Sequence, residues 1–253
     1  MTGKTHKSGG MLCTLVGFLL LKWHNLLLPN VNDLLQFIVI YPFAMWGSVA
    51  SDLDHHWDNC PDKSIPSYII NKVLHIPTKT YKRLDMILTP RQKKESRSYK
   101  VCKILSANHR SWQTHSDLTL MFFIFLLFST LNGNILGRVL THAESTLLSL
   151  VLTGICIGII AHFILDMLTP QGVWFTLGVV INRVNKTNLL PEKIRVVPKM
   201  SLFATSSAWE SFICSIIKKL TVVFTIIFLV DLVNPDMLTS MFDFLKSLSI
   251  EIS

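Results

Sequence analysis

The stretch LLSLVLTGICIGIIAHFILDML, which runs from Leu147 to Leu168, decides how this chain folds. It contains no Lys, Arg, Asp or Glu before Asp166, which stands near its end. A helix of about 20 apolar residues is long enough to cross a hydrocarbon core of about 30 Å. We therefore predict that this stretch is a membrane-spanning helix and that the chain is not an ordinary water-soluble enzyme.

The rest of the sequence has the composition of a protein with several such helices. Half of its 253 residues are apolar and only 16% are charged, whereas soluble domains carry about 25% charged residues. Lys218 and Lys219 stand inside the last apolar run, so we predict four to five spans. The fold class that we predict is an all-α, polytopic membrane helical bundle. The predicted spans are 11–28, 34–51, 117–137, 146–168 and 212–233.

Lys and Arg are unevenly distributed between the two sides of this predicted bundle. Alternate threading puts residues 1–10, 52–116 and 169–211 on one side, and these segments hold 19 of the 24 Lys and Arg. Such residues are in excess on the cytoplasmic side of membrane proteins, so we predict a cytoplasmic N-terminus and a basic cytoplasmic loop over 52–116. This topology also explains the net charge of +8. We therefore expect membrane lipid, and not nucleic acid, as the partner, and the oligomeric state is left open.

Part of the cytoplasmic loop is strongly basic. The segment from Lys79 to Lys103 contains nine basic and two acidic residues. It is either a solvated loop of the positive side or a surface that holds anionic lipid headgroups.

Most of the His residues and several Asp residues gather at the ends of the predicted spans on this same side. His162 and Asp166 are four residues apart and share one helical face. Asp52 and His55 share a face if the second span continues as a helix to His55. Ionisable residues at membrane depth are rare and usually functional. The clustered residues are His6, Asp52, Asp54, His55, His109, His115, His162 and Asp166.

Small residues on two of the spans would bring these clusters together. Gly154 and Gly158 lie two turns and one turn before His162, and Gly47 begins a similar stripe in the second span. Such residues let helices approach closely. Each cluster alone has a structural interpretation, as an interfacial His pair or a hydrogen bond between turns. Four clusters on one face favour a metal site.

The residue types in the clusters indicate the kind of metal. His nitrogens and carboxylate oxygens without thiolate suit zinc or another divalent transition ion. The five cysteines have no paired spacing and do not indicate a zinc–thiolate site. More than four candidate ligands leave room for two or three ions, as in many phosphoester hydrolases. The predicted metal ligands are His6, Asp52, His55, His109, His115, His162 and Asp166.

Several ordered motifs carry a family resemblance, namely His6, Ser51-Asp-Leu-Asp-His55, His109-Arg110, Thr114-His-Ser116, His162-xxx-Asp166-Met-Leu-Thr-Pro-x-Gly172 and Glu210. They resemble the motifs of the YdjM-like family, LexA-regulated bacterial inner-membrane proteins, over residues 1 to about 212. The resemblance implies a metal-dependent hydrolase in the bacterial inner membrane, with phospholipid as the suggested substrate. A more distant resemblance, to helical zinc-dependent phospholipases C and nucleases, implies a site with three ions. We accordingly predict a membrane-embedded hydrolase domain over 1–212, followed by a C-terminal span and tail over 213–253.

The clusters and the resemblance together predict hydrolysis of an ester or phosphoester at the cytoplasmic face, with a membrane phospholipid as the simplest substrate. Asp54 or Glu210 is a candidate general base, and Arg110 offers a planar donor fork suited to phosphate. The third span starts beside His115, and the N–H groups at a helix start favour an anion. The alternative is a non-enzymatic scaffold or a metal-ion carrier. A carrier needs polar residues in mid-span, where the second, third and fourth spans have almost no charge.

Overall fold

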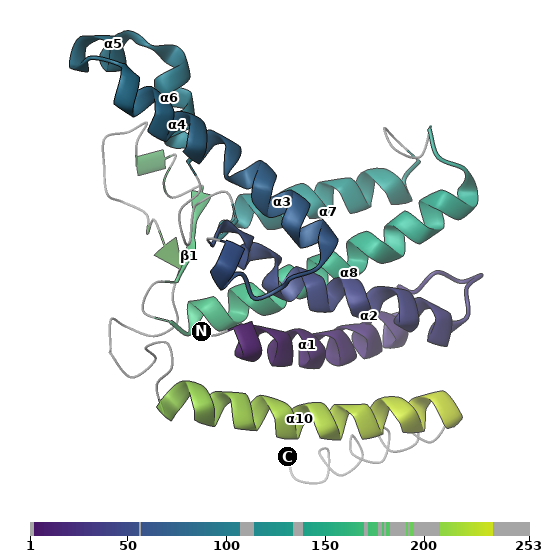
Figure 1. The fold of residues 1–253 in the computed structure, drawn as a ribbon. Helices are drawn as coiled ribbons and strands as arrows, with labels where there is room; N and C mark the ends of the chain where they lie inside the picture. Colours follow the sequence, from purple (N-terminus) through teal and green to yellow (C-terminus); the bar gives the residue numbers. More distant parts are fainter. Residues whose placement is uncertain are drawn as a thin grey trace.

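The computed structural model is almost entirely helical in the part of the chain that it describes (Figure 1). This part consists of residues 3–55, 57–106, 114–133, 139–169, 172–176 and 208–234, with positions 179, 181, 182, 191, 193 and 194. The predicted all-α fold class is confirmed.

Five long helices form the bundle. In Figure 1 they run in roughly the same or opposite directions, with α10 packed against α1, and with α8 packed against α1, α2 and α7. They are α1 (Gly3–Trp23), α2 (Asp33–Ala50), α7 (Asp117–Leu131), α8 (His142–Met167) and α10 (Ala208–Val233).

Three helical segments of the described chain are long and apolar enough to cross a membrane: Asp33–Asp54, His142–Met167 and Ala208–Val233. They correspond to the second, fourth and fifth predicted spans. The first predicted span is displaced, because α1 already begins at Gly3 and ends at Trp23, which places His6 inside the helix. In place of the third predicted span, the structure has the shorter apolar helix α7, Asp117–Leu131. The total of four to five spans therefore stays a prediction.

The segment predicted as a basic loop folds into further helices. These helices contain no long apolar run, so the apolar pattern that predicts spans does not reveal them. Ser64, Thr89 and Ser96 each precede one of these helices and accept a hydrogen bond from a first-turn N–H, which satisfies a donor that would otherwise lack a partner. The remaining elements are η1 (Ser51–Asp54), η2 (Trp57–Asn59), α3 (Ile65–Leu74), α4 (Ile76–Ile87), α5 (Pro90–Glu95), α6 (Arg97–Ile104) and the antiparallel pair β1 (Val173–Trp174) and β2 (Lys193–Ile194).

Glycines set the distance between α2 and α8. A Cβ atom on Gly154 would lie 2.5 Å from the carbonyl oxygen of Ile40, and one on Gly47 would lie 2.7 Å from that of Ile155. A Cβ atom on Gly158 would overlap the Ala44 carbonyl oxygen. The two backbones therefore touch, and the close approach predicted from the glycine stripe is confirmed.

The opposite end of the bundle is held by apolar packing and by an ionic contact. Phe18, which is fully buried, lies edge-on to Phe37 and Phe228, with ring centroids 5.3 and 5.8 Å away. Beyond them, the Lys22 ammonium lies 2.6 Å from Asp231 of α10. These contacts join α1, α2 and α10 at the end that is distant from the clustered His and Asp residues.

Replacing Gly158 with Ala should separate α2 from α8, because the added methyl group has no space beside the Ala44 carbonyl. Overpacking of this kind costs about 1–3 kcal/mol, and thermal unfolding of the purified protein in detergent measures the loss. Gly17→Ala is the matched control, since its Cβ would meet Ile157 at an ordinary 3.4 Å. Equal unfolding temperatures for the two variants would contradict the importance of the α2–α8 contact.

Candidate metal centre

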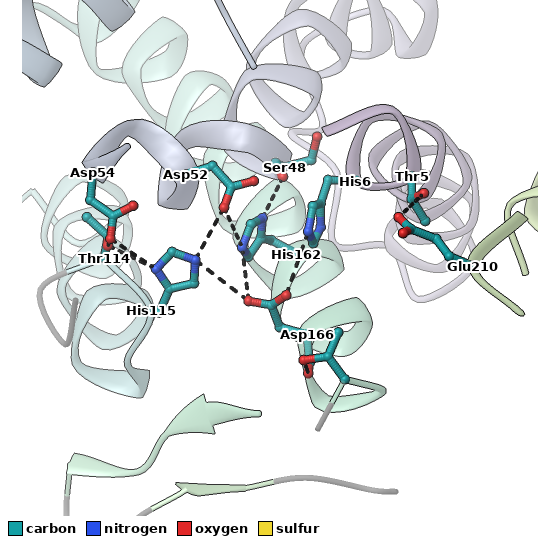
Figure 2. A network of polar contacts seen from close by, with 11 residues as sticks. Thr5, His6, Ser48, Asp52, Asp54, Thr114, His115, His162, Asp166 and Glu210 are labelled. Carbon is teal, nitrogen blue, oxygen red and sulfur yellow. Dashed lines mark hydrogen bonds and ion pairs between the residues drawn. The ribbon is translucent and has the colours of Figure 1, made fainter. Parts of the chain in front are cut away.

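Five buried His and Asp side chains from different elements converge at one end of the bundle (Figure 2). Their exposed fractions lie between 0% and 7%. They are His6 from α1, Asp52 from η1, His115 from the segment before α7, and His162 and Asp166 from α8.

These side chains form two groups that share His162. One group consists of His6, Asp52 and His162, and the other of His115, His162 and Asp166. In each group the three potential ligand atoms lie within 4.8 Å of one another, so that each could hold a metal ion. The donors are nitrogen and carboxylate oxygen, which suit a divalent transition ion.

His162 is oriented as a metal ligand. Its Nδ1 lies 2.8 Å from the carbonyl oxygen of Ser48, and because a carbonyl can only accept, Nδ1 must carry the proton. The other ring nitrogen, Nε2, lies 3.3 Å from Asp166 and 3.9 Å from Asp52. This Nε2 is buried and has no hydrogen-bond partner in the described part of the chain. A carbonyl that accepts from the other ring nitrogen fixes the ring of metal-bound His residues in this way, so the residues present fit a metal ion.

His115 faces the same carboxylates from the other side. Its Nε2 lies 3.4 Å from Asp52 and 3.7 Å from Asp166. Its Nδ1 lies 3.0 Å from the Thr114 hydroxyl, which donates to Asp54 at 2.9 Å. Burial opposes protonation of His115, but the nearby carboxylates of Asp52 and Asp54 outweigh it and raise its pKa to about 9. A metal ion that binds His115 near neutral pH must therefore displace a proton.

His6 completes the cluster from α1. Its ring stacks on that of His162, with centroids 3.9 Å apart and planes inclined by 15°. Its Nε2 lies 3.7 Å from Asp166. The preceding residue, Thr5, donates a hydrogen bond of 2.8 Å to Glu210 of α10. α10 thus supports the helix turn that carries His6.

The turn after α2 separates two residues that the sequence groups together. α2 ends at Ala50 and the chain continues as the tighter turn η1, after which His55 is extended. Asp52 consequently points into the cluster, whereas His55 belongs to neither ligand group. The condition for a shared helical face is not met, because the helical turn ends at Asp54 and His55 is extended. The buried Asn71 of α3 fixes this turn by donating to the carbonyls of Leu53 and His55, at 2.6 and 2.8 Å.

The segment after α8 returns the chain to the cluster. The Thr169 hydroxyl donates to the Asp166 carbonyl at 2.8 Å, and Gly172 adopts a φ of 63°, which favours glycine. The amide of Trp174 then donates to the His115 carbonyl at 2.9 Å. This local geometry explains the presence of Thr169 and Gly172 after Asp166.

The sequence model of a family described as "YdjM inner membrane protein" matches residues 1–230. The chain belongs to this family. Its YdjM membership and its apolar helices make it a membrane protein. No curated protein and no solved structure matches the chain. The match continues beyond position 212 through most of α10, the helix that supports Thr5.

The remaining candidates of this YdjM-family site lie outside the two ligand groups. Asp54 is buried behind His115, and Figure 2 shows Glu210 beside Thr5, beyond His6. His109 and Arg110 lie outside the described residues. Their roles as ligands or catalytic groups stay predictions.

Two contributors to the centre were not identified from the sequence. Ser48 acts through its main-chain carbonyl, which any residue could supply. The only sequence signal for its role is its position next to Gly47, which lies on the stripe of small residues where α2 and α8 pack. Asn71 stands in the segment predicted as a loop, and its polar side chain between Ile69, Ile70 and Val73 was the available signal.

Replacing Asp52, His162 or Asp166 individually, as Asp→Asn or His→Ala, should lower the affinity for divalent metal by about 10–100-fold or more. Each change removes one donor from a shared set. Elemental analysis of the purified variants and competition with a chelating dye give the metal content and affinity.

The control for these variants is His142→Ala, which changes an exposed residue at the start of α8. His75 is unsuitable, although the sequence groups it with no cluster, because its Nε2 lies 3.0 Å from the His55 carbonyl. Wild-type metal content in both α8 variants would remove that helix from the site.

Proposed function

We propose that this chain is a metal-dependent hydrolase that cleaves a phosphoester, with a membrane phospholipid as substrate, at the cytoplasmic face of the bacterial inner membrane. One observation carries the proposal: His162 is held by a carbonyl with its free Nε2 among two buried carboxylates. Zinc fits this donor set, and because Nε2 of His162 binds one ion, a second ion would have to be held by the remaining donors. In such a site a bound divalent ion polarises a phosphoryl oxygen and makes a water molecule more acidic.

The side chains of the cluster have distinct roles in this proposal. Asp52 and Asp166 supply charge and hold the imidazoles of His115 and His162 in place. Asp54 and Thr114 orient the ring of His115 from its Nδ1 side. This placement favours a positioning role for Asp54 over that of the general base. Glu210 supports the turn that carries His6.

Recognition of an anionic substrate rests on Arg110 in this proposal. The helix start of α7 is less open to an anion than its position suggests, because the Asp117 carboxylate already accepts from the amides of Leu118 and Thr176, at 2.9 and 2.8 Å. The Arg110 guanidinium can donate two parallel hydrogen bonds to a phosphate group, and Arg110 follows His109, a ligand that the family resemblance implies.

Wild-type protein in vesicles that contain phospholipid should release a hydrolysis product, and Asp166→Asn should not.

Arg110→Lys keeps the positive charge but loses the planar pair of guanidinium donors, so turnover should fall at least about tenfold while metal content stays normal. Mass spectrometry of the lipids measures the product. Wild-type turnover in both Arg110→Lys and Arg110→Ala would favour a neutral carboxylic ester, and bound metal without any hydrolysis would favour the scaffold or carrier.

We also propose that the chain crosses the membrane several times with its N-terminus in the cytoplasm. The start of α1, the turn η1 and the end of α8 lie at the same end of the bundle (Figure 1). The basic helices α4 to α6 adjoin that end, which favours the cytoplasmic side.

Cys102 tests this orientation, because it lies on α6 and is partly exposed, whereas Cys60 is buried. An impermeant maleimide should leave Cys102 unmodified in intact cells and should modify it after lysis, as read by peptide mass spectrometry. Cys102→Ser provides the background. Modification in intact cells would reverse the proposed topology.

A further inference from the structure

Helices α3 and α4, with the shorter α5 and α6, form an arm over residues 65–105 that extends away from the bundle (Figure 1). The arm is attached where α2 ends. The Trp46 indole of α2 donates to the Ser67 hydroxyl at 2.8 Å, and Asn71 holds the backbone of η1. The arm therefore begins at the level of the metal centre.

The polarity of α3 is the reverse of that expected for a helix on the surface of a soluble protein. Its face toward the protein buries the polar side chains of Ser67 and Asn71, which are 0% and 2% exposed. Its outward face is mostly apolar, with spacings of three and four residues that place all its members on one side. These outward residues, all exposed, are Ile65, Tyr68, Ile69, Lys72 and Val73.

The details of this outward face suit a lipid interface. Ile65 and Ile69 are 77% and 56% exposed, which would be unfavourable in water. The Lys72 ammonium lies 4.9 Å from the centre of the Tyr68 ring. A Lys with an aromatic ring beside apolar side chains is typical of helices that lie in the headgroup region.

The outward face becomes cationic along α4. Lys79, Lys82 and Arg83 are exposed on one side of this helix and are followed there by Met86 and Ile87, which are 79% and 76% exposed. Between Lys79 and Lys103 there are nine basic and two acidic residues.

The two acidic residues of that segment are already paired with cations inside the arm. Asp85 lies 2.8 Å from Lys93, and Glu95 lies 3.2 Å from Arg91. The arm therefore keeps a surplus of positive charge, of which the exposed Lys79, Lys82 and Arg83 lie between two exposed apolar stretches.

We propose that the arm is an interfacial docking element that lies on the anionic surface of the lipid bilayer, with the α3 side chains among the acyl chains and the α4 cations on the phosphate groups. Apolar area and basic charge on one face are the two contributions that bind helices to anionic membranes. Because Asn71 joins α3 to η1, docking also fixes the height of the metal-bearing turn relative to the headgroups.

The test uses the full chain in nanodiscs of equal parts phosphatidylcholine and phosphatidylglycerol. p-Benzoylphenylalanine replaces either Ile69, on the outward face, or Ile70, on the face toward the protein, and the irradiated protein is weighed by mass spectrometry. Lipid adducts should be at least about fivefold more frequent at position 69 than at position 70, as the helical geometry requires. The proposal would be overturned by equally frequent lipid adducts at the two positions. It would also be overturned if position 69 formed crosslinks to protein and none to lipid.

The charge contribution is tested with the same reagent at position 87. Adducts with phosphatidylglycerol should exceed those with phosphatidylcholine by about twofold. In the triple variant Lys79→Gln/Lys82→Gln/Arg83→Gln, adducts with the two lipids should become equally frequent. The control variant Lys218→Gln/Lys219→Gln removes charge outside the arm and should leave the ratio of the two adducts unchanged. Parity in the unsubstituted arm would refute anionic selection.

Hydrolysis is measured on the same discs, so that the two proposals can fail separately. Lipid adducts at position 69 without hydrolysis support the docking element and refute only the proposed activity. Hydrolysis without these adducts refutes only the docking element.

Discussion

The backbone contact between α2 and α8 is the constraint on which the metal centre depends. Gly47, Gly154 and Gly158 let the two helices touch, so that the Ser48 carbonyl reaches Nδ1 of His162. The same contact brings the end of α2, and with it Asp52, beside Asp166, one turn after His162 on α8. A single added methyl group in this interface would move ligands at both helix ends, because helices transmit displacement along their whole length.

The centre concentrates negative charge where water cannot compensate for it. Asp52, Asp54 and Asp166 are all nearly or fully buried, and an isolated buried carboxylate is strongly unfavourable. Asp52 and Asp54 raise the pKa of His115, so that a proton on its ring offsets part of this charge, and a cation bound among the imidazoles and carboxylates would offset more. A cation at this point would therefore stabilise the buried carboxylates, and this stabilisation is the physical basis of metal affinity.

The arm and the centre are parts of one arrangement. Asn71 is buried because its amide satisfies two carbonyls of the turn that carries Asp52, and its burial forces the opposite, apolar face of α3 outward. A helix with polar groups inside and apolar groups outside is stable only beside a nonpolar phase. The positioning of Asp52 and the affinity of the arm for lipid thus follow from the same orientation of α3.

The sequence by itself determined the helical membrane fold, the glycine contact and most of the side chains that meet at the centre. These properties are local, since hydropathy and helical spacing need only neighbouring residues, as in Leu147 to Leu168 with His162 and Asp166. Tertiary structure decided that His55 lies outside both ligand groups, that Asp54 stands behind His115, and that Ser48 and Asn71 support the centre. Those outcomes depend on a tight turn after α2 and on main-chain carbonyls brought close from distant parts of the chain. A sequence does not mark which carbonyl will be near, because every residue carries one, and only packing selects among them.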